Sequence, residues 1–175
     1  PVITDDTSGE ELVLVESGAI IEYLMQNYGK NSSLIIPKTG SQQERDYRYW
    51  LHFSEGSLMS PLLLRLIFHR IKTTPVPFFV KPITKAIANK VLSEFVNPNI
   101  DRLLDFIDSS LKGKQWFLGD QLSGADIQMS YPLEASVASG LIDDHYPDIQ
   151  SYVERIHQQP AYQSALLKGG KYDYV

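Results

Sequence analysis

From about residue 41 onward, apolar residues recur at intervals of three and four, the spacing of one face of a helix. The segment 41–72 shows this pattern throughout, and Pro61 predicts a kink or break within it. Asn97 and Pro98 are expected to supply the N-cap and first-turn proline of a helix that ends near Gly113. Further helices are expected at about 82–96, 123–138, 147–158 and 160–167, so most of the chain is predicted to be helical.

The first residues have a different character. "PVITDD" and "ELVLV" are short β-type runs joined by a loop that contains Gly9, and they predict a hairpin. A helix is expected from Ser17 to about Tyr28, where Gly29 ends it. Because two strands alone are not stable in water, we expect further strands that this sequence does not contain. The predicted fold class is therefore α+β overall and mainly α, with a domain boundary near residue 40.

The composition excludes several classes of protein. With 43% hydrophobic residues in 175, the chain suits one large or two small packed domains, and its net charge of −5 gives no general attraction to nucleic acid. It contains no cysteine, so a disulfide, a thiolate metal site or a cysteine nucleophile is excluded within this stretch. No apolar run approaches the roughly 18 to 20 residues of a membrane span, so we expect a cytoplasmic protein without a membrane span.

A metal site is not expected. None of the four histidines has the spacing of a metal site; they are His52, His69, His145 and His157. The acidic run that begins at Asp143 is interpreted as the cap of the helix that starts near Pro147, rather than as part of a metal site.

The stretch "LSGADI" is the clearest helix-start signal in the chain. Ser123 and Asp126 have the spacing at which each side chain caps the other's backbone N–H group. We prefer this capping box to a catalytic Ser and Asp pair, because no histidine is near in the sequence to act as a base. Loss of the Asp126 contact is expected to reduce stability by about 1 kcal/mol or more, which is a folding effect.

The corner between strand and helix, "VESGAI", carries Glu16 and Ser17. A helix N-terminus attracts anions, so Ser17 has the groups to bind a carboxylate while Glu16 pairs with an ammonium. An α-amino acid head group would satisfy both residues. The alternative is that Ser17 only caps its own helix, which local sequence alone favours. Pro1 and Val2 support the ligand, because an X–Pro bond at a strand start, unlike other peptide bonds, is able to adopt the cis form and would then turn a backbone edge toward a bound peptide.

Three features in this order resemble the cytosolic glutathione transferase (glutathione S-transferase) superfamily: "PVI", "LVESGAIIEYL" and, about a hundred residues later, "FLGDQLSGADI". The resemblance covers nearly the whole chain. It implies that residues 1–33 are the C-terminal part of a thioredoxin-like glutathione-binding domain, 34–40 a linker and 41–175 the all-helical C-terminal domain. It also implies that the first strand, helix and strand of the thioredoxin-like domain are missing from this sequence.

The resemblance implies a role for each residue of the corner. Pro1 is the expected cis-proline, Val2 pairs its backbone with the cysteinyl part of glutathione, and Glu16 and Ser17 hold the γ-glutamyl head. Ser123 and Asp126 are folding residues in the family. The catalytic Tyr, Ser or Cys of such proteins comes from the missing elements, so it is expected upstream of Pro1 and stays unknown.

We therefore expect a glutathione transferase, of the EC 2.5.1.18 type, that conjugates or reduces small electrophiles in detoxification. Glutathione is the expected co-substrate, and the protein is expected to be a homodimer. An apolar substrate is expected near Tyr49, His52 and Phe53 on the long helix. Two alternatives stay open: a glutathione-transferase-like binding or interaction module without activity, and a plain helical interaction domain.

Overall fold

The computed structural model describes residues 1–174, apart from the side chain of Asn31. Contacts between residues divide the chain into two compact units. Unit 1 comprises residues 1–53 and 113–131, and unit 2 comprises residues 54–112 and 132–175. These units combine segments that are distant in the sequence, whereas the sequence suggested consecutive domains. The domain bounds predicted from the sequence stay a prediction.

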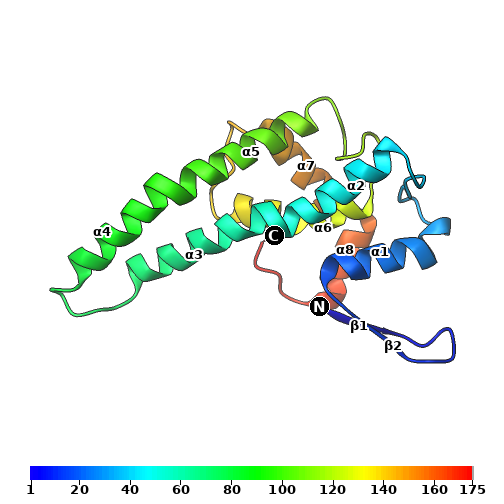
Figure 1. The fold of residues 1–175 in the computed structure, drawn as a ribbon, viewed down its shortest axis with the longest axis horizontal. Helices are drawn as coiled ribbons and strands as arrows, with labels where there is room; N and C mark the ends of the chain where they lie inside the picture. The colour runs from blue at the N-terminus through cyan, green and yellow to red at the C-terminus, as the bar shows by residue number, and fades with distance from the viewer. Residues whose placement is uncertain (175) are drawn as a thin grey trace. The chain divides into compact units, whose positions relative to one another are not determined.

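The hairpin of unit 1 pairs β1 (Val2–Asp5) with β2 (Leu12–Val15) in antiparallel register. The helix α1 (Ser17–Tyr28) follows β2 after one residue, and the short turn η1 (Gly29–Asn31) follows α1 (Figure 1). The predicted hairpin and the predicted bounds of this helix are confirmed.

The side chain of Asp5 ties the hairpin to α1. Its Oδ2 accepts hydrogen bonds from the hydroxyls of Tyr28 and Tyr23, the latter at 2.6 Å. Its Oδ1 accepts from the backbone N–H of Thr7 at 2.9 Å and from the Thr7 hydroxyl at 2.7 Å. Hydrogen bonds from Thr7, Tyr23 and Tyr28 hold the pKa of the Asp5 carboxyl well below its usual range. The hydrogen bond between Tyr23 and Asp5 also raises the pKa of Tyr23 to about 12.

This network predicts a pH dependence. Because the folded state lowers the pKa of Asp5, it favours the ionised carboxylate. The resulting stabilisation of the fold is complete at pH values above 3.8, the ordinary pKa of this carboxyl, and it is lost as the pH falls below that value. We expect the wild type to be more stable than Asp5→Asn at neutral pH and this difference to shrink below about pH 4. Thermal unfolding at a series of pH values checks it. Asp6→Asn, at the exposed neighbouring residue, is the control; a difference of equal size in that variant would contradict the prediction.

The predicted long helix is three consecutive segments. They are α2 (Gln42–Phe53), the π-helical turn η2 (Ser54–Met59) and α3 (Ser60–Thr73). Pro61 lies at the start of α3, where its missing N–H is tolerated. The predicted disturbance is therefore present, but it falls in the turn before the proline.

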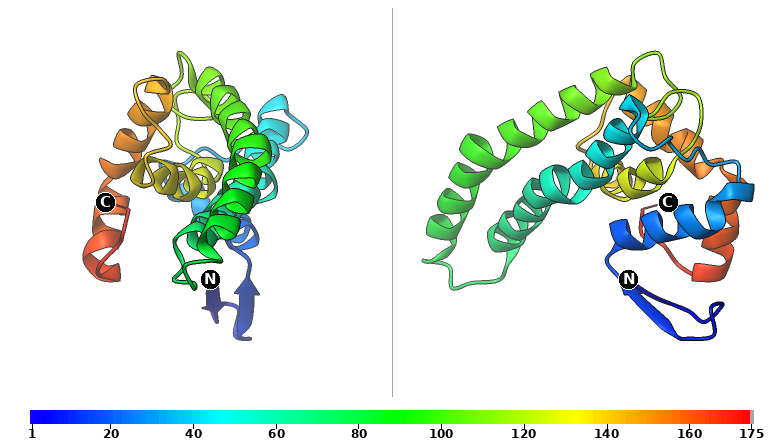
Figure 2. Two further views of the ribbon diagram at one scale, coloured as in Figure 1. Left: turned by 90° about the vertical axis from the view of Figure 1, so that its left-hand side faces the viewer. Right: turned by 45° about the vertical axis from the view of Figure 1, so that its right-hand side comes forward.

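A second helical run follows in the same form. It consists of α4 (Lys81–Val91), the π-helical turn η3 (Leu92–Val96) and α5 (Asn97–Leu111). In unit 2, α3 and α4 lie side by side as a hairpin (Figure 2). The prediction that Asn97 is an N-cap is wrong, because Asn97 is helical and its N–H bonds to the carbonyl of Leu92. Its side chain instead accepts a hydrogen bond from Arg65 at 3.1 Å.

Within unit 2, α5 contacts α3 and α7 (Pro147–His157). The residues Ile100, Leu104, Ile107 and Leu111 of α5 are fully buried. The helix α8 (Pro160–Gly169) follows α7.

The cap of α7 differs from the predicted one. The Oδ1 of Asp108, on α5, accepts hydrogen bonds from the backbone N–H groups of Asp148 and Ile149, both at 3.0 Å. Asp143 was interpreted as this cap, but its carboxylate accepts from the N–H of His145, and no side chain caps the helix from its own N-cap residue. Asp108, whose carboxylate accepts from the first amides of α7, lies 40 residues before Asp148 in the chain.

The helix α6 (Gly124–Ala138) precedes α7 in the chain; its first residues belong to unit 1 and its last residues to unit 2. The fold class predicted from the sequence, α+β and mainly α, is confirmed by these elements. Among residues 1–174, no helix has the length and apolar character needed to cross a membrane.

Candidate functional site

The corner between β2 and α1 is built around an unusual backbone conformation. Glu16 has φ 72° and ψ 121°, and it is the one non-glycine residue with positive φ among those described. Residues other than glycine rarely adopt this backbone region, because it costs them about 1 to 3 kcal/mol. Residues in such conformations are concentrated at functional sites. This conformation of Glu16 lets the chain change from strand to helix within a single residue.

The start of α1 is open to an anion. No side chain of its N-cap residue makes a capping hydrogen bond, and no acidic residue lies in its first turn. The first N–H groups of a helix have no partner within it, and they carry the positive end of the helix dipole. Since Glu16 occupies the N-cap position and Ser17 is the first helical residue, the alternative in which Ser17 caps its own helix is wrong.

The hairpin brings Val2 to the same corner. Val2 pairs with Val15, which directly precedes Glu16, and its side chain is exposed. The residues predicted to contact glutathione therefore lie together. The peptide bond that precedes Pro1 lies outside the sequence, so the cis assignment stays a prediction.

A fourth residue reaches this corner from a distant part of the chain. The side-chain Nε2 of Gln128, on α6, donates a hydrogen bond to the Oγ of Ser17 at 2.9 Å. Gln128 is buried, and Ser17 is partly buried. This contact was not predicted from the sequence, because a single glutamine 111 residues from Ser17 carries no local signal.

The beginning of α6 is held by Asp126. Its Oδ2 accepts hydrogen bonds from the backbone N–H of Ser123 at 2.8 Å and from the Ser123 hydroxyl at 2.7 Å, and its Oδ1 accepts from the N–H of Phe117 at 2.9 Å. All three residues are buried. Burial raises the pKa of the Asp126 carboxyl, while the hydrogen bonds from Ser123 and Phe117 oppose this effect. The carboxylate thus joins the helix start to the loop before it.

Gly124 lets α6 approach α1 closely. A Cβ atom at this position would lie 2.6 Å from a methyl carbon of Ile21, 2.7 Å from the hydroxyl of Tyr47 and 3.3 Å from Cγ of Met25. A side chain larger than hydrogen does not fit there. The neighbouring residue Ser123 forms a parallel bridge with Ile35, which ties the segment after α1 to the same place.

The residues predicted to bind an apolar substrate all lie on α2. Tyr49 and His52 are exposed, and Tyr49 is within ring contact of Phe53, at 5.6 Å between centroids. Phe53 itself is buried. The surface available to a ligand is therefore that of Tyr49 and His52, and the substrate-binding role of this group stays a prediction.

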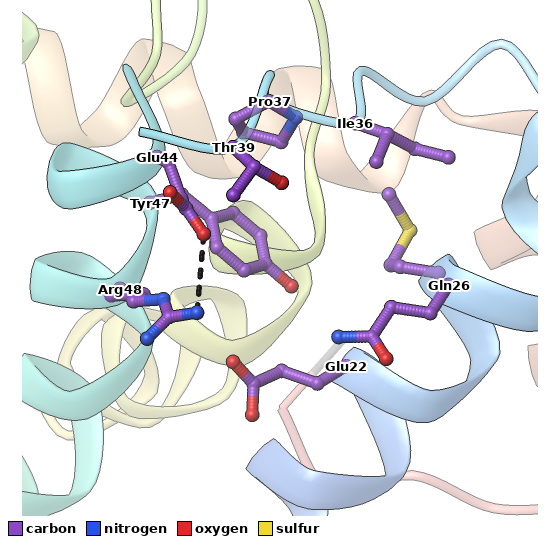
Figure 3. Close-up of a pocket in the computed structure, with 9 residues that line it drawn as sticks. Glu22, Gln26, Ile36, Pro37, Thr39, Glu44, Tyr47 and Arg48 are labelled. Carbon is purple, nitrogen blue, oxygen red and sulfur yellow. Dashed lines mark hydrogen bonds and ion pairs between the residues drawn. The ribbon is translucent and has the colours of Figure 1, made fainter. Parts of the chain in front are cut away.

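A hollow between α1, α2 and the intervening segment lies apart from these residues. Figure 3 shows Tyr47 projecting from α2 toward Glu22 and Gln26 on α1, with Arg48 paired to Glu44. The Tyr47 hydroxyl is buried and has no hydrogen-bond partner among the described residues, and burial followed by the charge of Glu22 raises its pKa to about 12. None of the residues predicted to contact glutathione lines this hollow.

In the described part of the chain, no cluster of histidine and carboxylate side chains has the form of a metal site.

Comparison with known proteins gives a consistent result. The family model described as "Glutathione S-transferase, C-terminal domain" matches residues 70–160. The chain is 26% identical to glutathione S-transferase 1 of Saccharomyces cerevisiae over 168 residues, which cover 95% of this chain and 71% of that protein. It is 29% identical to glutathione S-transferase 3 of Schizosaccharomyces pombe over 169 residues, which cover 96% of this chain and 66% of that protein.

Solved structures agree with the fold. A glutathione S-transferase from Actinobacillus pleuropneumoniae matches 99% of this chain and 71% of its own, with a TM-score of 0.72 and 29% identity. A glutathione transferase from Pseudomonas putida, with one glutathione disulfide bound per subunit, matches 97% of this chain and 70% of its own, with a TM-score of 0.71 and 25% identity.

These matches account for both parts of the fold. The β1–β2 hairpin and α1 correspond to part of the thioredoxin-like domain of these proteins, and the remaining helices correspond to their helical domain. The predicted fold class and the predicted family are confirmed. The chain belongs to the glutathione S-transferase family.

Proposed function

We propose that the full-length protein is a glutathione transferase and that the corner at Glu16 and Ser17 binds the γ-glutamyl head of glutathione. The carboxylate of that head accepts hydrogen bonds from the N–H and hydroxyl of Ser17, and its ammonium pairs with Glu16. The backbone of Val2 pairs with the cysteinyl part. The observation that carries the proposal is the positive φ of Glu16, since it places an uncapped helix start beside an exposed carboxylate.

The chemistry follows from the binding mode. Glutathione reacts through its thiolate, so the enzyme lowers the thiol pKa and increases the fraction of nucleophile at neutral pH. The group that does this is expected upstream of Pro1. An apolar electrophile is expected at Tyr49 and His52, next to Phe53. The start of α1 is within reach of this helix, because Leu51 lies 3.9 Å from the Cβ position of Gly18.

Other properties belong to the same proposal. Conjugation of the EC 2.5.1.18 type, a role in detoxification, a homodimeric assembly and a cytoplasmic location are each proposed here for the whole protein. The glutathione disulfide in the Pseudomonas putida relative supports a site for glutathione or its disulfide. The alternative is a binding module that keeps the corner and lacks activity.

Removal of the Ser17 hydroxyl tests the binding site. A hydrogen bond to a charged group contributes about 1.5 to 3 kcal/mol, so we expect Ser17→Ala to weaken glutathione binding by about 10- to 100-fold. Isothermal titration calorimetry on the full-length protein measures this effect. Ser17→Thr, which keeps a hydroxyl, should retain most of the affinity.

The control for this test is Ser8→Ala, which removes an exposed hydroxyl from the hairpin loop. It should bind glutathione as the wild type does. Equal affinity of Ser17→Ala and wild type would show that the corner does not hold the ligand. Glutathione binding without conjugation of chloro-dinitrobenzene, and without reduction of disulfides or peroxides, would instead identify the inactive module.

A further inference from the structure

We propose that Gln128 is a positioning residue that makes the hydroxyl of Ser17 a hydrogen-bond donor toward the carboxylate of glutathione. This inference rests on the proposed function, and it assigns to α6 a part in ligand binding beyond its part in folding. The observation that carries it is the hydrogen bond from Nε2 of Gln128 to Oγ of Ser17, at 2.9 Å.

The direction of this hydrogen bond decides what Ser17 offers to a ligand. A serine hydroxyl has one proton to donate and two lone pairs to accept with. Because the amide of Gln128 donates to Oγ, it occupies a lone pair and leaves the hydroxyl proton free to point elsewhere. An ionised carboxylate only accepts hydrogen bonds, so it requires that proton. In the opposite orientation, Ser17 would direct a lone pair at the carboxylate and repel it.

The position of Gln128 is fixed by the packing of α6 against α1. Gly124 contacts α1 at Ile21, and Gln128 contacts it at Ser17. These contacts are four residues apart on each helix, in opposite directions along the chain. Four residues advance a helix by about 6 Å, so both contacts are satisfied by two helices that run antiparallel at this point. The buried amide of Gln128 is therefore placed by the same packing that requires glycine at position 124.

Gln128→Glu tests the direction of the bond with almost no change in shape. An ionised glutamate accepts hydrogen bonds only, so it turns the Ser17 proton inward, and its charge repels the glutathione carboxylate. We expect the dissociation constant for glutathione to increase by about tenfold or more at neutral pH. In a turnover assay the same change appears in KM for glutathione, with kcat at saturating glutathione retained.

The pH dependence of binding distinguishes positioning from a structural defect. Burial raises the pKa of a glutamate, and a protonated glutamate is able to donate to Ser17 again. The affinity of Gln128→Glu relative to that of the wild type at the same pH should therefore recover as the pH is lowered from about 8 toward 5, because titration of the bound thiol affects both proteins alike. The glutathione α-carboxylate stays ionised over this range, because its pKa is about 3.5. A misfolded site would not recover in this way.

Three further variants complete the test. Gln121→Glu places the same charge on an exposed residue before α6 and should bind glutathione normally. Gln128→Met keeps the length of the side chain without a donor, and it should weaken binding at every pH. In a Ser17→Ala background, Gln128→Glu should lose most of its effect, because the hydroxyl that it reorients is gone.

The outcomes separate this inference from the proposed function. If the wild type binds glutathione and Gln128→Glu binds equally well, or if its loss of affinity does not depend on pH, the inference is overturned and the proposed function stands. If Gln128→Glu does not fold, wild-type affinity in Gln128→Met overturns it in the same way. If the wild type does not bind glutathione, the proposed function fails first.

Discussion

Asp126→Ala is expected to lower the free energy of unfolding by about 3 to 5 kcal/mol, because it leaves two buried backbone N–H groups, those of Ser123 and Phe117, without their acceptor. Each such group costs about 1 to 3 kcal/mol when it is left unpaired. The loss is a large fraction of the about 5 to 15 kcal/mol that stabilises a typical domain. Chemical denaturation of the purified full-length variant measures it.

Ser123→Ala is the matched control. It removes the serine hydroxyl but leaves both N–H groups bonded to Asp126, so we expect a loss of only about 1 kcal/mol. Equal losses in the two variants would mean that Asp126 acts only as a helix cap and that its bond to Phe117 adds nothing.

Gly124→Ala is expected to destabilise the protein by about 1 to 3 kcal/mol, the usual cost of forcing an extra carbon into a packed site. The new Cβ would lie 2.6 Å from Ile21 and 2.7 Å from the ring hydroxyl of Tyr47, and both are parts of stiff side chains. The helix has to move away from α1 to make room. We therefore also expect weaker glutathione binding, because the same movement separates Gln128 from Ser17.

Gly56→Ala provides the comparison for Gly124→Ala. Gly56 lies in the helical turn η2, has no atom within 4 Å of its Cβ position and does not have positive φ. Alanine there should be neutral or stabilising by up to about 1 kcal/mol. If Gly124→Ala behaves like Gly56→Ala in thermal unfolding, the close approach of α6 and α1 is not a structural requirement.

The elements that the sequence predicted well depend on local signals. The bounds of α1 follow from the apolar spacing after Ser17 and from Gly29, and the structure has them as predicted. On α5 the apolar residues Ile100, Leu103, Leu104, Ile107 and Leu111 have helical spacing, and all of them except the half-buried Leu103 are fully buried. Such signals are read from neighbouring residues, because the helix period and the helix ends are set by residues within one or two turns.

The two wrong cap assignments depend on distant residues. Asn97 has the residue type of a cap, but the π-helical turn before it continues the helix, and Arg65 bonds to its side chain. Asp143 lies just before α7, but the carboxylate of Asp108 reaches the first amides of that helix. In both cases a residue on another helix determines the hydrogen bonds at the position of the expected cap. Such a contact cannot be predicted from the neighbouring sequence.

The candidate site divides in the same way. Glu16 and Ser17 stood out because a carboxylate and a hydroxyl lie at a change from strand to helix. The positive φ of Glu16 was not predicted, since non-glycine residues rarely adopt it and only the surrounding structure imposes it. Gln128 was not predicted either, because its role arises from the antiparallel contact of α1 and α6.

The contact between Ser17 and Gln128 also sets an order of events during synthesis. The two residues are 111 positions apart, and a ribosome adds about 5 to 20 residues per second. Ser17 is therefore made roughly 5 to 20 seconds before the side chain that orients its hydroxyl. A nascent chain that stops before α6 contains Glu16 and Ser17 without Gln128. If the proposed site is correct, such a chain is expected to bind glutathione more weakly than one that includes α6.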